Sequence, residues 1–362
     1  MPIESLVHGR LIESLRAAAD GYFEIDAVKF GVPFPPFNDA IRLDGRFLTA
    51  TDIAYDAISE RARRDGFLIY FREEEEQPVV YAVMGDLPVT RPNWAVFAAL
   101  LIITLASIFF VGGVTEDGID WAMGLSFALP LILILLAHEF GHFLVSRRNH
   151  MATSPPYFIP MPFSIFGTMG AVIIMRTPPK NRKQLFQMAV AGPLAGLALA
   201  IPFMIYGLSI SKVGPMPPPP YLMEGNSLFY LGLKWLFFHQ FLPGNGMDVQ
   251  LHNIAFAAWV GFFITGLNLI PAGQLDGGHV IYTLFGKKVK PISYVLVSVF
   301  LLMSIKFPGW LLWAALLFFL GRVYAVPMDD LTPLSGKYKA LGYFMIVLLI
   351  LFFVPNPISV IR

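Results

Sequence analysis

The chain has 362 residues, of which 56% are hydrophobic and only 14% are charged, whereas soluble domains carry roughly 25% charged residues. This composition excludes a disordered chain and argues against a wholly soluble enzyme, and the absence of cysteine excludes disulfides and thiolate chemistry. Residues 1–90 carry 16 acidic and 9 basic side chains, whereas residues 91–362 carry 9 acidic and 17 basic ones. We therefore expect a soluble acidic domain at 1–90 and a membrane domain at 91–362. No nucleic-acid partner is expected, because the basic residues flank apolar runs.

The first 90 residues have the pattern of a small α+β domain. The expected helices are residues 7–19 and 51–65, and the expected strands are residues 22–30, 41–43, 47–48, 67–71 and 79–84. Asp44-Gly45 is a hairpin-turn signal, and Thr51 can cap the second helix. The acidic run 73–76 is either a docking patch or a solvated hairpin loop, and the loop is the commoner origin of such a run.

Seven apolar runs follow residue 92, and a membrane-spanning helix needs roughly 20 mostly apolar residues. The candidate runs are residues 94–114, 122–145, 185–208, 253–271, 293–307, 309–326 and 340–354. The last three are shorter or less clear, so the alternative count is six spans. The stretch 228–242 contains Lys234 and His239, and we expect it to be interfacial or re-entrant.

The basic residues predict which way the spans run. The link between the second and third runs carries six basic side chains and no acidic one, whereas the short link 115–121 carries three acidic side chains and no basic one. Because basic residues in short loops mark the cytoplasmic side, the second run is expected to enter from outside. The N-terminal domain and the end of the second run then both lie on the cytoplasmic side.

That end of the second run carries His138, Glu139 and His142. On a helix, side chains four residues apart point the same way, so the two imidazoles can bind one zinc ion. Glu139 lies about 100° around the helix from His138 and can reach a water beside the metal as a general base. Ionisable groups inside a span are costly and usually functional. The alternative is two buried histidines hydrogen-bonded to the backbone beside a neutral Glu139.

A zinc hydrolase needs a third protein ligand, and Asp276 is the best candidate. It follows the fourth apolar run at the same expected level as the histidines, among glycine and proline residues that allow the backbone to bend. Glu224 and Asp248 lie in a predicted outer loop and cannot easily reach. Taken alone, Asp276 is equally consistent with a turn aspartate before glycine.

The His-Glu-x-x-His motif in one span, followed by the pattern Asn-x-x-Pro-x-x-x-x-Asp-Gly at residues 268–277, resembles the site-2 protease family of zinc intramembrane metalloproteases. The resemblance covers residues 122–282. It implies hydrolysis of peptide bonds within or beside membrane spans of protein substrates, with one zinc ion per chain. The implied roles are zinc binding by His138, His142 and Asp276, water activation by Glu139, and positioning of substrate or oxyanion by Asn268.

Residues 167–175 are apolar, rich in β-branched side chains and bracketed by prolines, and they are too short to span. A re-entrant strand or hairpin that dips toward the zinc is one interpretation, and the family is known for such a segment; a short amphipathic surface segment is the other. We hypothesise an edge strand that pairs with unwound substrate. Its proposed substrate-binding residues are Gly167, Gly170, Ala171, Val172 and Ile173.

The sequence thus predicts a polytopic α-helical membrane protein of six to seven spans, with a re-entrant β segment and a small N-terminal α+β soluble domain. Its expected function is that of an intramembrane zinc endopeptidase acting in regulated intramembrane proteolysis, with membrane-spanning proteins and the bilayer as partners. The alternative is a non-proteolytic membrane protein that binds metal or conducts ions. The carboxylate beside the first histidine favours hydrolysis, because a permeation path does not require it. Oligomeric state, substrate identity and trigger do not follow from the sequence.

Overall fold

The computed structural model describes residues 3–87, 91–289, 291–321 and 323–361, and it divides into two compact units. Unit 1 comprises Met1–Val89, Thr177–Leu185 and Val326–Ser335. Unit 2 comprises Thr90–Arg176, Phe186–Ala325 and Gly336–Arg362. We call Thr177–Leu185 and Val326–Ser335 the inserted segments, because they belong to unit 1 although they are far from its other residues in sequence.

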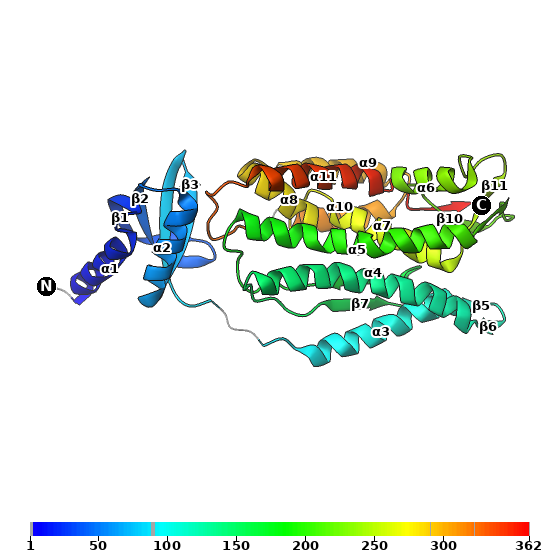
Figure 1. The fold of residues 1–362 in the computed structure, drawn as a ribbon, viewed down its shortest axis with the longest axis horizontal. Helices are drawn as coiled ribbons and strands as arrows, with labels where there is room; N and C mark the ends of the chain where they lie inside the picture. The colour runs from blue at the N-terminus through cyan, green and yellow to red at the C-terminus, as the bar shows by residue number, and fades with distance from the viewer. Residues whose placement is uncertain (1–2, 88–90, 290, 322, 362) are drawn as a thin grey trace. The chain divides into compact units, whose positions relative to one another are not determined.

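Unit 1 is built on a four-stranded antiparallel sheet with strand order β1-β2-β4-β3, accompanied by two helices (Figure 1). Its elements are α1 (Ile3–Ala19), β1 (Phe23–Phe34), β2 (Phe37–Phe47), α2 (Thr51–Arg64), β3 (Phe67–Glu74) and β4 (Gln77–Met84). Both helices contribute side chains to one hydrophobic core with the sheet, which includes Leu15 and Tyr55 from the helices and Phe71 and Val80 from the strands. The expected α+β region is therefore present.

Two local predictions in unit 1 are wrong. Asp44-Gly45 is not a turn: β2 continues through it, and Phe34 pairs with Phe37 so that the chain reverses at Pro35-Pro36. Asp44 and Gly45 instead lie opposite an irregularity in β1, where a side chain at Gly45 would overlap the Glu24 carbonyl. A glycine suits such a bulge because the backbones approach closely there.

The predicted cap at Thr51 is the second wrong prediction. The residue that precedes α2 is Ala50, which makes no side-chain capping bond, and the Oγ1 atom of Thr51 lies 2.8 Å from the Oγ1 atom of Thr332. Thr332 belongs to an inserted segment. The hydroxyl group is therefore used for a long-range contact rather than for the helix end.

The acidic run forms the β3–β4 hairpin, in line with the loop interpretation. Glu75 and Glu76 make the turn with positive φ angles, while Glu74 accepts hydrogen bonds from Arg42 at 2.6 Å and from the Tyr81 hydroxyl at 2.7 Å. Burial, together with the nearby Glu74 carboxylate, raises the pKa of Tyr81 to about 12. This part of the acidic run is thus engaged within the sheet.

The inserted segments extend the sheet of unit 1 beyond β3. The amide of Phe71 donates to the Met328 carbonyl at 2.9 Å, and the amide of Asp330 donates back to the Phe71 carbonyl at 3.3 Å. On the other side, the amides of Met328 and Asp329 donate to the carbonyls of Pro179 and Lys180, both at 2.8 Å. Both pairings are parallel bridges, through Phe71 with Asp329 and through Asn181 with Asp329.

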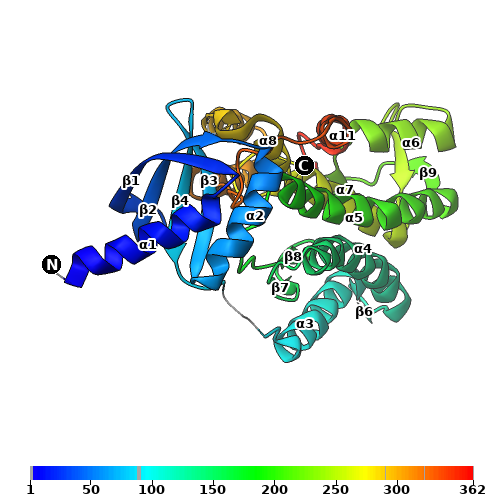
Figure 2. The ribbon, with the colours of Figure 1, turned by 60° about the vertical axis from the view of Figure 1, so that its left-hand side comes forward.

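Unit 2 is mainly helical, with α3, α4 and α5 running side by side in both views (Figures 1 and 2). Its helices are α3 (Trp94–Gly113), α4 (Trp121–Arg148), α5 (Arg182–Ile210, which begins in unit 1), α6 (Leu228–Phe238), α7 (Asn253–Asn268), α8 (Asp276–Phe285), η1 (Gly286–Val289), α9 (Ile292–Met303), α10 (Gly309–Leu320) and α11 (Gly336–Phe352). Among the described residues, α3, α4 and α5 are long and apolar enough to cross a membrane.

The other predicted spans correspond to shorter helices. α7, α9, α10 and α11 have 16, 12, 12 and 17 residues. A helix of 12 residues is about 18 Å long, which is less than the roughly 30 Å of a hydrocarbon core. A count of six or seven spans therefore stays a prediction.

The segment 167–175 forms one arm of a hairpin of β7 (Tyr157–Met161) and β8 (Gly167–Val172), so Ile173 lies just beyond the strand. β7 and β8 pack on α3, and β8 also contacts α4 (Figure 2). The Ser107 hydroxyl donates to the Gly167 carbonyl at 2.6 Å, and a Cβ at Gly167, where φ is +73°, would lie 2.6 Å from the Ile108 backbone. Only glycine fits this approach without strain. How deeply the hairpin enters a membrane stays a prediction.

The remaining strands of unit 2 are short and pair in twos. They are β5 (Val114–Thr115) with β6 (Gly118–Ile119), β9 (Lys212–Pro215) with β11 (Met247–Gln250), and β10 (Tyr221–Glu224) with β12 (Ile358–Ile361).

Candidate metal centre

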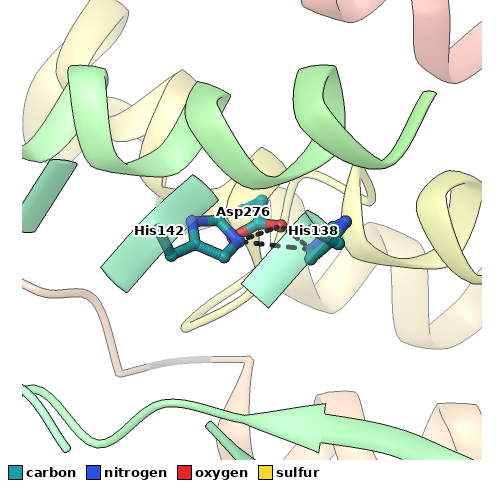
Figure 3. Close-up of side chains that lie close together, drawn as sticks. All are labelled: His138, His142 and Asp276. Atoms are coloured by element: carbon teal, nitrogen blue, oxygen red, sulfur yellow. Dashed lines mark hydrogen bonds and ion pairs between the residues drawn. The ribbon is translucent and has the colours of Figure 1, made fainter. Parts of the chain in front are cut away.

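Three side chains from α4 and α8 converge in unit 2 (Figure 3). His138 and His142 lie one helical turn apart in α4, and their Nε2 atoms are 3.2 Å apart. Asp276 is the first residue of α8, and its Oδ2 atom lies 3.3 Å from each of those nitrogens. Within the described part of the chain, this is the one group of three or more His, Asp and Glu side chains whose ligand atoms lie this close together.

The spacing of these three atoms can be tested against zinc. Zinc in proteins is usually tetrahedral, with bonds of roughly 2.0–2.1 Å to imidazole nitrogen and carboxylate oxygen, and two ligands of such a tetrahedron are about 3.3 Å apart. The three observed separations of 3.2, 3.3 and 3.3 Å therefore form one face of the expected tetrahedron. Two imidazoles and one carboxylate leave the fourth position open, as in catalytic zinc sites.

The orientation of His142 is set by α5. Its Nδ1 atom lies 2.8 Å from the Met188 carbonyl, and since a carbonyl only accepts, Nδ1 carries the proton and Nε2 keeps its lone pair. One turn further along α5, a side chain at Gly192 would overlap the Nε2 atom of His142. The site therefore depends on a close passage of α5 over α4 at a residue without a Cβ.

Of the two remaining predicted site residues, Asn268 contacts this centre and Glu139 is next to His138 in sequence. Asn268, the last residue of α7, places its Nδ2 atom 3.2 Å from the Nε2 atom of His138. Glu139 follows His138 in α4, is 6% exposed, and does not belong to the group of three ligands. The structure thus places an amide beside His138 and buries Glu139 in the same helix as the two histidines.

Other acidic and histidine residues from the sequence lie elsewhere or contribute no ligand atom. His279 is buried one turn after Asp276 but does not join the group of three. Glu224 accepts a hydrogen bond from Tyr230 at 3.1 Å, and Asp248 pairs with the buried Lys234 at 3.5 Å. Both carboxylates, which the sequence places out of reach of the histidines, therefore have other partners.

Sequence reasoning missed the Met188 carbonyl and the role of Gly192 beside His142. The glycine-proline step at 192–193 is visible inside an apolar run, but a main-chain carbonyl has no residue signature. No feature of the sequence indicates which carbonyl will meet a histidine from another helix.

Comparisons with known proteins agree with this geometry. Residues 126–305, which include every residue of the centre, match the model of peptidase family M50. The chain is 25% identical over 347 residues to the "Probable zinc metalloprotease EGY2, chloroplastic" of Arabidopsis thaliana, covering 90% of this chain and 62% of that protein. It is 30% identical over 241 residues to the "Probable zinc metalloprotease EGY1, chloroplastic" of the same plant, covering 63% of this chain and 43% of that protein. No solved structure matches the chain.

Proposed function

The chain belongs to the site-2 protease family, peptidase family M50, and from this premise we propose that it is a zinc-dependent endopeptidase acting on membrane-spanning proteins. It spans about three fifths of the length of the EGY2 relatives, so its own activity is inferred from its own site. The observation that carries the proposal is the triangle of ligand atoms formed by His138, His142 and Asp276.

The proposed chemistry divides between the metal and the protein. Zinc, when bound by His138, His142 and Asp276, supplies the Lewis acidity that polarises the scissile carbonyl and makes water more acidic. Glu139 then accepts the proton of the attacking water as general base and can pass it to the leaving amine. Asn268 offers an amide N–H that can hydrogen-bond the substrate or its developing oxyanion.

The position of the centre in an apolar helix supports a membrane substrate. α4 is one of the three described helices that can cross a membrane, and its two histidines, His138 and His142, are 4% and 8% exposed. A substrate helix hides its peptide carbonyls in its own hydrogen bonds, so it must unwind locally before water can attack.

β8 is the proposed site at which unwound substrate is held. Among the described strands, β8 has β7 as its one partner, and it contacts the helix that carries the histidines. An unpaired strand edge can bind an extended peptide through main-chain hydrogen bonds, and the proposed contacts are Gly167, Gly170, Ala171, Val172 and Ile173. Proline at Val172 and, separately, at Ile173 tests this: normal cleavage by both variants would refute the edge-strand hypothesis.

The distribution of basic residues further supports a cytoplasmic position for the N-terminal domain and for the centre. Accessibility tags inserted after Glu116 and near Asn181 should therefore report opposite sides of the membrane. A tag near Asn181 found outside would reverse this proposed orientation.

The test of the function compares the full-length protein with Glu139→Gln on a membrane-spanning substrate in liposomes. The variant keeps the size of the side chain and should keep zinc, but it lacks the base, so cleavage should fall by roughly 10²–10⁴-fold. Equal cleavage by both proteins would remove Glu139 from the mechanism. Tight zinc binding without cleavage by the unaltered protein would favour the alternative of a non-proteolytic metal-binding protein.

A further inference from the structure

Five aromatic rings of unit 2 link α4 to the turn of the β7–β8 hairpin. Phe127 of α4 and Phe256 of α7 have ring centroids 5.5 Å apart. Along α7 the stack continues from Phe256 to Trp259 at 5.7 Å and from Trp259 to Phe263 at 5.8 Å, with interplanar angles of 6° and 9°. Phe166, in the turn before β8, lies 6.3 Å from Trp259 and 5.9 Å from Phe263, again between ring centroids. We call these five rings the aromatic ladder, and all five belong to unit 2.

Phe166 rests on two rings that are themselves fixed in place. Trp259 and Phe263 are 1% and 8% exposed, and the indole Nε1 of Trp259 donates to the Gly225 carbonyl at 2.8 Å. Aromatic pairs with centroids roughly 4.5–7 Å apart attract each other beyond the effect of burial alone. The half-buried Phe166 side chain is therefore an anchor that attaches the hairpin turn to α7.

A second helix holds the next residue of the hairpin. The Gly167 carbonyl accepts from the Ser107 hydroxyl of α3, and the Gly167 backbone passes directly against that of Ile108. The Thr168 hydroxyl then donates to the Ile159 carbonyl at 2.9 Å and so joins β8 to β7. Adjacent residues at the start of β8 are thus attached to two different helices, which fixes this end of the strand within unit 2.

The aromatic ladder also leads to the metal centre. α7 ends at Asn268, five residues after Phe263 and about 7.5 Å further along the helix axis, and the Asn268 amide contacts His138. α4 carries Phe127 as well as the two histidines. The hairpin is therefore attached to the same two helices that place Asn268 and the histidines, so its position relative to the centre is set.

This attachment matters for a substrate held on the edge of β8. Successive residues of an extended chain lie about 3.4 Å apart, so a shift of β8 by that length would present the next peptide bond to the centre. A misplacement of about 1 Å can already cost roughly 100-fold in rate. The choice of bond therefore depends on how firmly the hairpin is held.

We propose that Phe166 is a positioning residue that determines which peptide bond of the substrate is cleaved. Through the aromatic ladder it fixes the edge of β8 at a set distance from the zinc ligands. Gly167 supplies the second attachment, to α3. The inference rests on the proposed function, because it takes the edge of β8 to hold an unwound membrane-spanning substrate.

The first test maps the cleaved bonds by mass spectrometry, using full-length protein and a membrane-spanning substrate in liposomes. Phe166→Ala should keep zinc, lower the rate at the principal bond by up to roughly 100-fold, and increase the share of products cut at neighbouring bonds. Phe166→Tyr keeps the ring and should restore the original pattern. Phe163→Ala is the matched control, because Phe163 lies in the same turn but is 99% exposed, so the pattern should stay unchanged.

The second test measures the position of the hairpin without substrate or metal. The chain has no cysteine, so Met169→Cys in β8 and Leu144→Cys in α4, at positions that are 53% and 60% exposed, can carry two nitroxide labels. Electron paramagnetic resonance then gives the distribution of the distance between the labels. The distribution should be narrow in the labelled protein, with Phe163→Ala and with Phe166→Tyr, and broad with Phe166→Ala.

The two tests together decide the proposal. If Phe166→Ala leaves the distance distribution narrow, the proposal is overturned. It is also overturned if the distribution broadens while the cleaved bonds stay those of the unaltered protein. If Phe166→Ala loses zinc, Phe263→Leu, which removes one ring contact of Phe166 but keeps an apolar side chain, is judged by the same two criteria. Absence of all cleavage by the unaltered protein counts against the proposed function, whereas the label distances still decide whether Phe166 positions the hairpin.

Discussion

Side chains build the metal centre of unit 2, whereas main-chain groups join the inserted segments to the sheet of unit 1. At the centre, three atoms of three residues form a triangle with sides of 3.2–3.3 Å. Around the inserted segments, four backbone hydrogen bonds share the task, and the Arg72 side chain of β3 adds bonds to the main-chain carbonyls of Pro327 and Met328. The loss of one ligand should therefore abolish zinc binding at the centre. A single change around the inserted segments should weaken their attachment to the sheet only in part.

The largest effect is expected at Asp276. Asp276→Asn replaces a carboxylate ligand by a neutral amide, which binds zinc poorly. Zinc affinity should fall by more than the roughly 10–100-fold that loss of an outer hydrogen bond causes, and cleavage should disappear. Metal analysis after a chelator challenge measures this, with Asp117→Asn, an exposed carboxylate outside the centre, as control. Firm zinc retention by Asp276→Asn would make His279 the next candidate ligand.

The next largest effect is expected when a methyl group is added at Gly192. In Gly192→Ala, the new Cβ would overlap the Nε2 atom of His142, so the ring or the helix must shift and zinc should leave at least about tenfold faster. Gly232→Ala in α6 is the control, because nothing lies within 4 Å of the Cβ that it would add. Zinc retention by Gly192→Ala equal to that of the unaltered protein would show that α5 does not constrain the centre.

The difference between side-chain and main-chain contacts also explains which parts of the structure could be predicted from the sequence. The chemistry of the centre depends on rare residue types at fixed spacing, so His138, Glu139, His142 and the region of Asp276 are visible in the sequence. The longest apolar runs likewise coincide with α3, α4 and α5, because hydrophobicity over 20 residues is a strong signal. The first helix and the strands on either side of the acidic run follow from local periodicity.

The parts that were missed depend on backbone contacts or on tertiary context. Every residue offers an amide and a carbonyl, so nothing in the sequence of Met328 or Pro179 marks it as a partner in the sheet of unit 1. Asp44-Gly45 has the residues of a turn, but long-range pairing of β2 with both β1 and β4 overrides the local preference. Thr51 has a good capping side chain, yet its hydroxyl forms a hydrogen bond with the hydroxyl of Thr332 instead.

A moderate effect is expected when core packing around an inserted segment is reduced. Met328 belongs to the hydrophobic core of unit 1 and is 5% exposed. Met328→Ala should lower the local free energy of unfolding of β3 by about 2 kcal/mol, measured by hydrogen exchange in the full-length protein. Met84→Ala, at a 64% exposed methionine of β4, should change it by less than about 0.5 kcal/mol. Equal effects would mean that the inserted segment is not part of the folded core.

The smallest effect concerns the register of β1 and β2. Because Asp44 lies opposite Ala27 rather than in a turn, its carboxylate is 2.9 Å from Lys29 and 2.7 Å from Arg42. Burial raises the pKa of Asp44, but the hydrogen bonds from Lys29 and Arg42 outweigh burial and leave this pKa below its usual value. The folded state therefore binds this proton less tightly than the unfolded state does.

It follows that the ion pairs stabilise the sheet above the unfolded pKa of about 3.9 and cease to do so as the pH falls through the lower folded pKa. Since Asp44 is a quarter exposed, the contribution is about 0.5–1 kcal/mol. Hydrogen exchange of β1 and β2, compared between the unaltered protein and Asp44→Asn, isolates this residue from the other carboxylates. The difference should be largest near pH 6 and vanish near pH 2. A difference that does not change with pH would place Asp44 away from Lys29 and Arg42, as a turn at Asp44-Gly45 would.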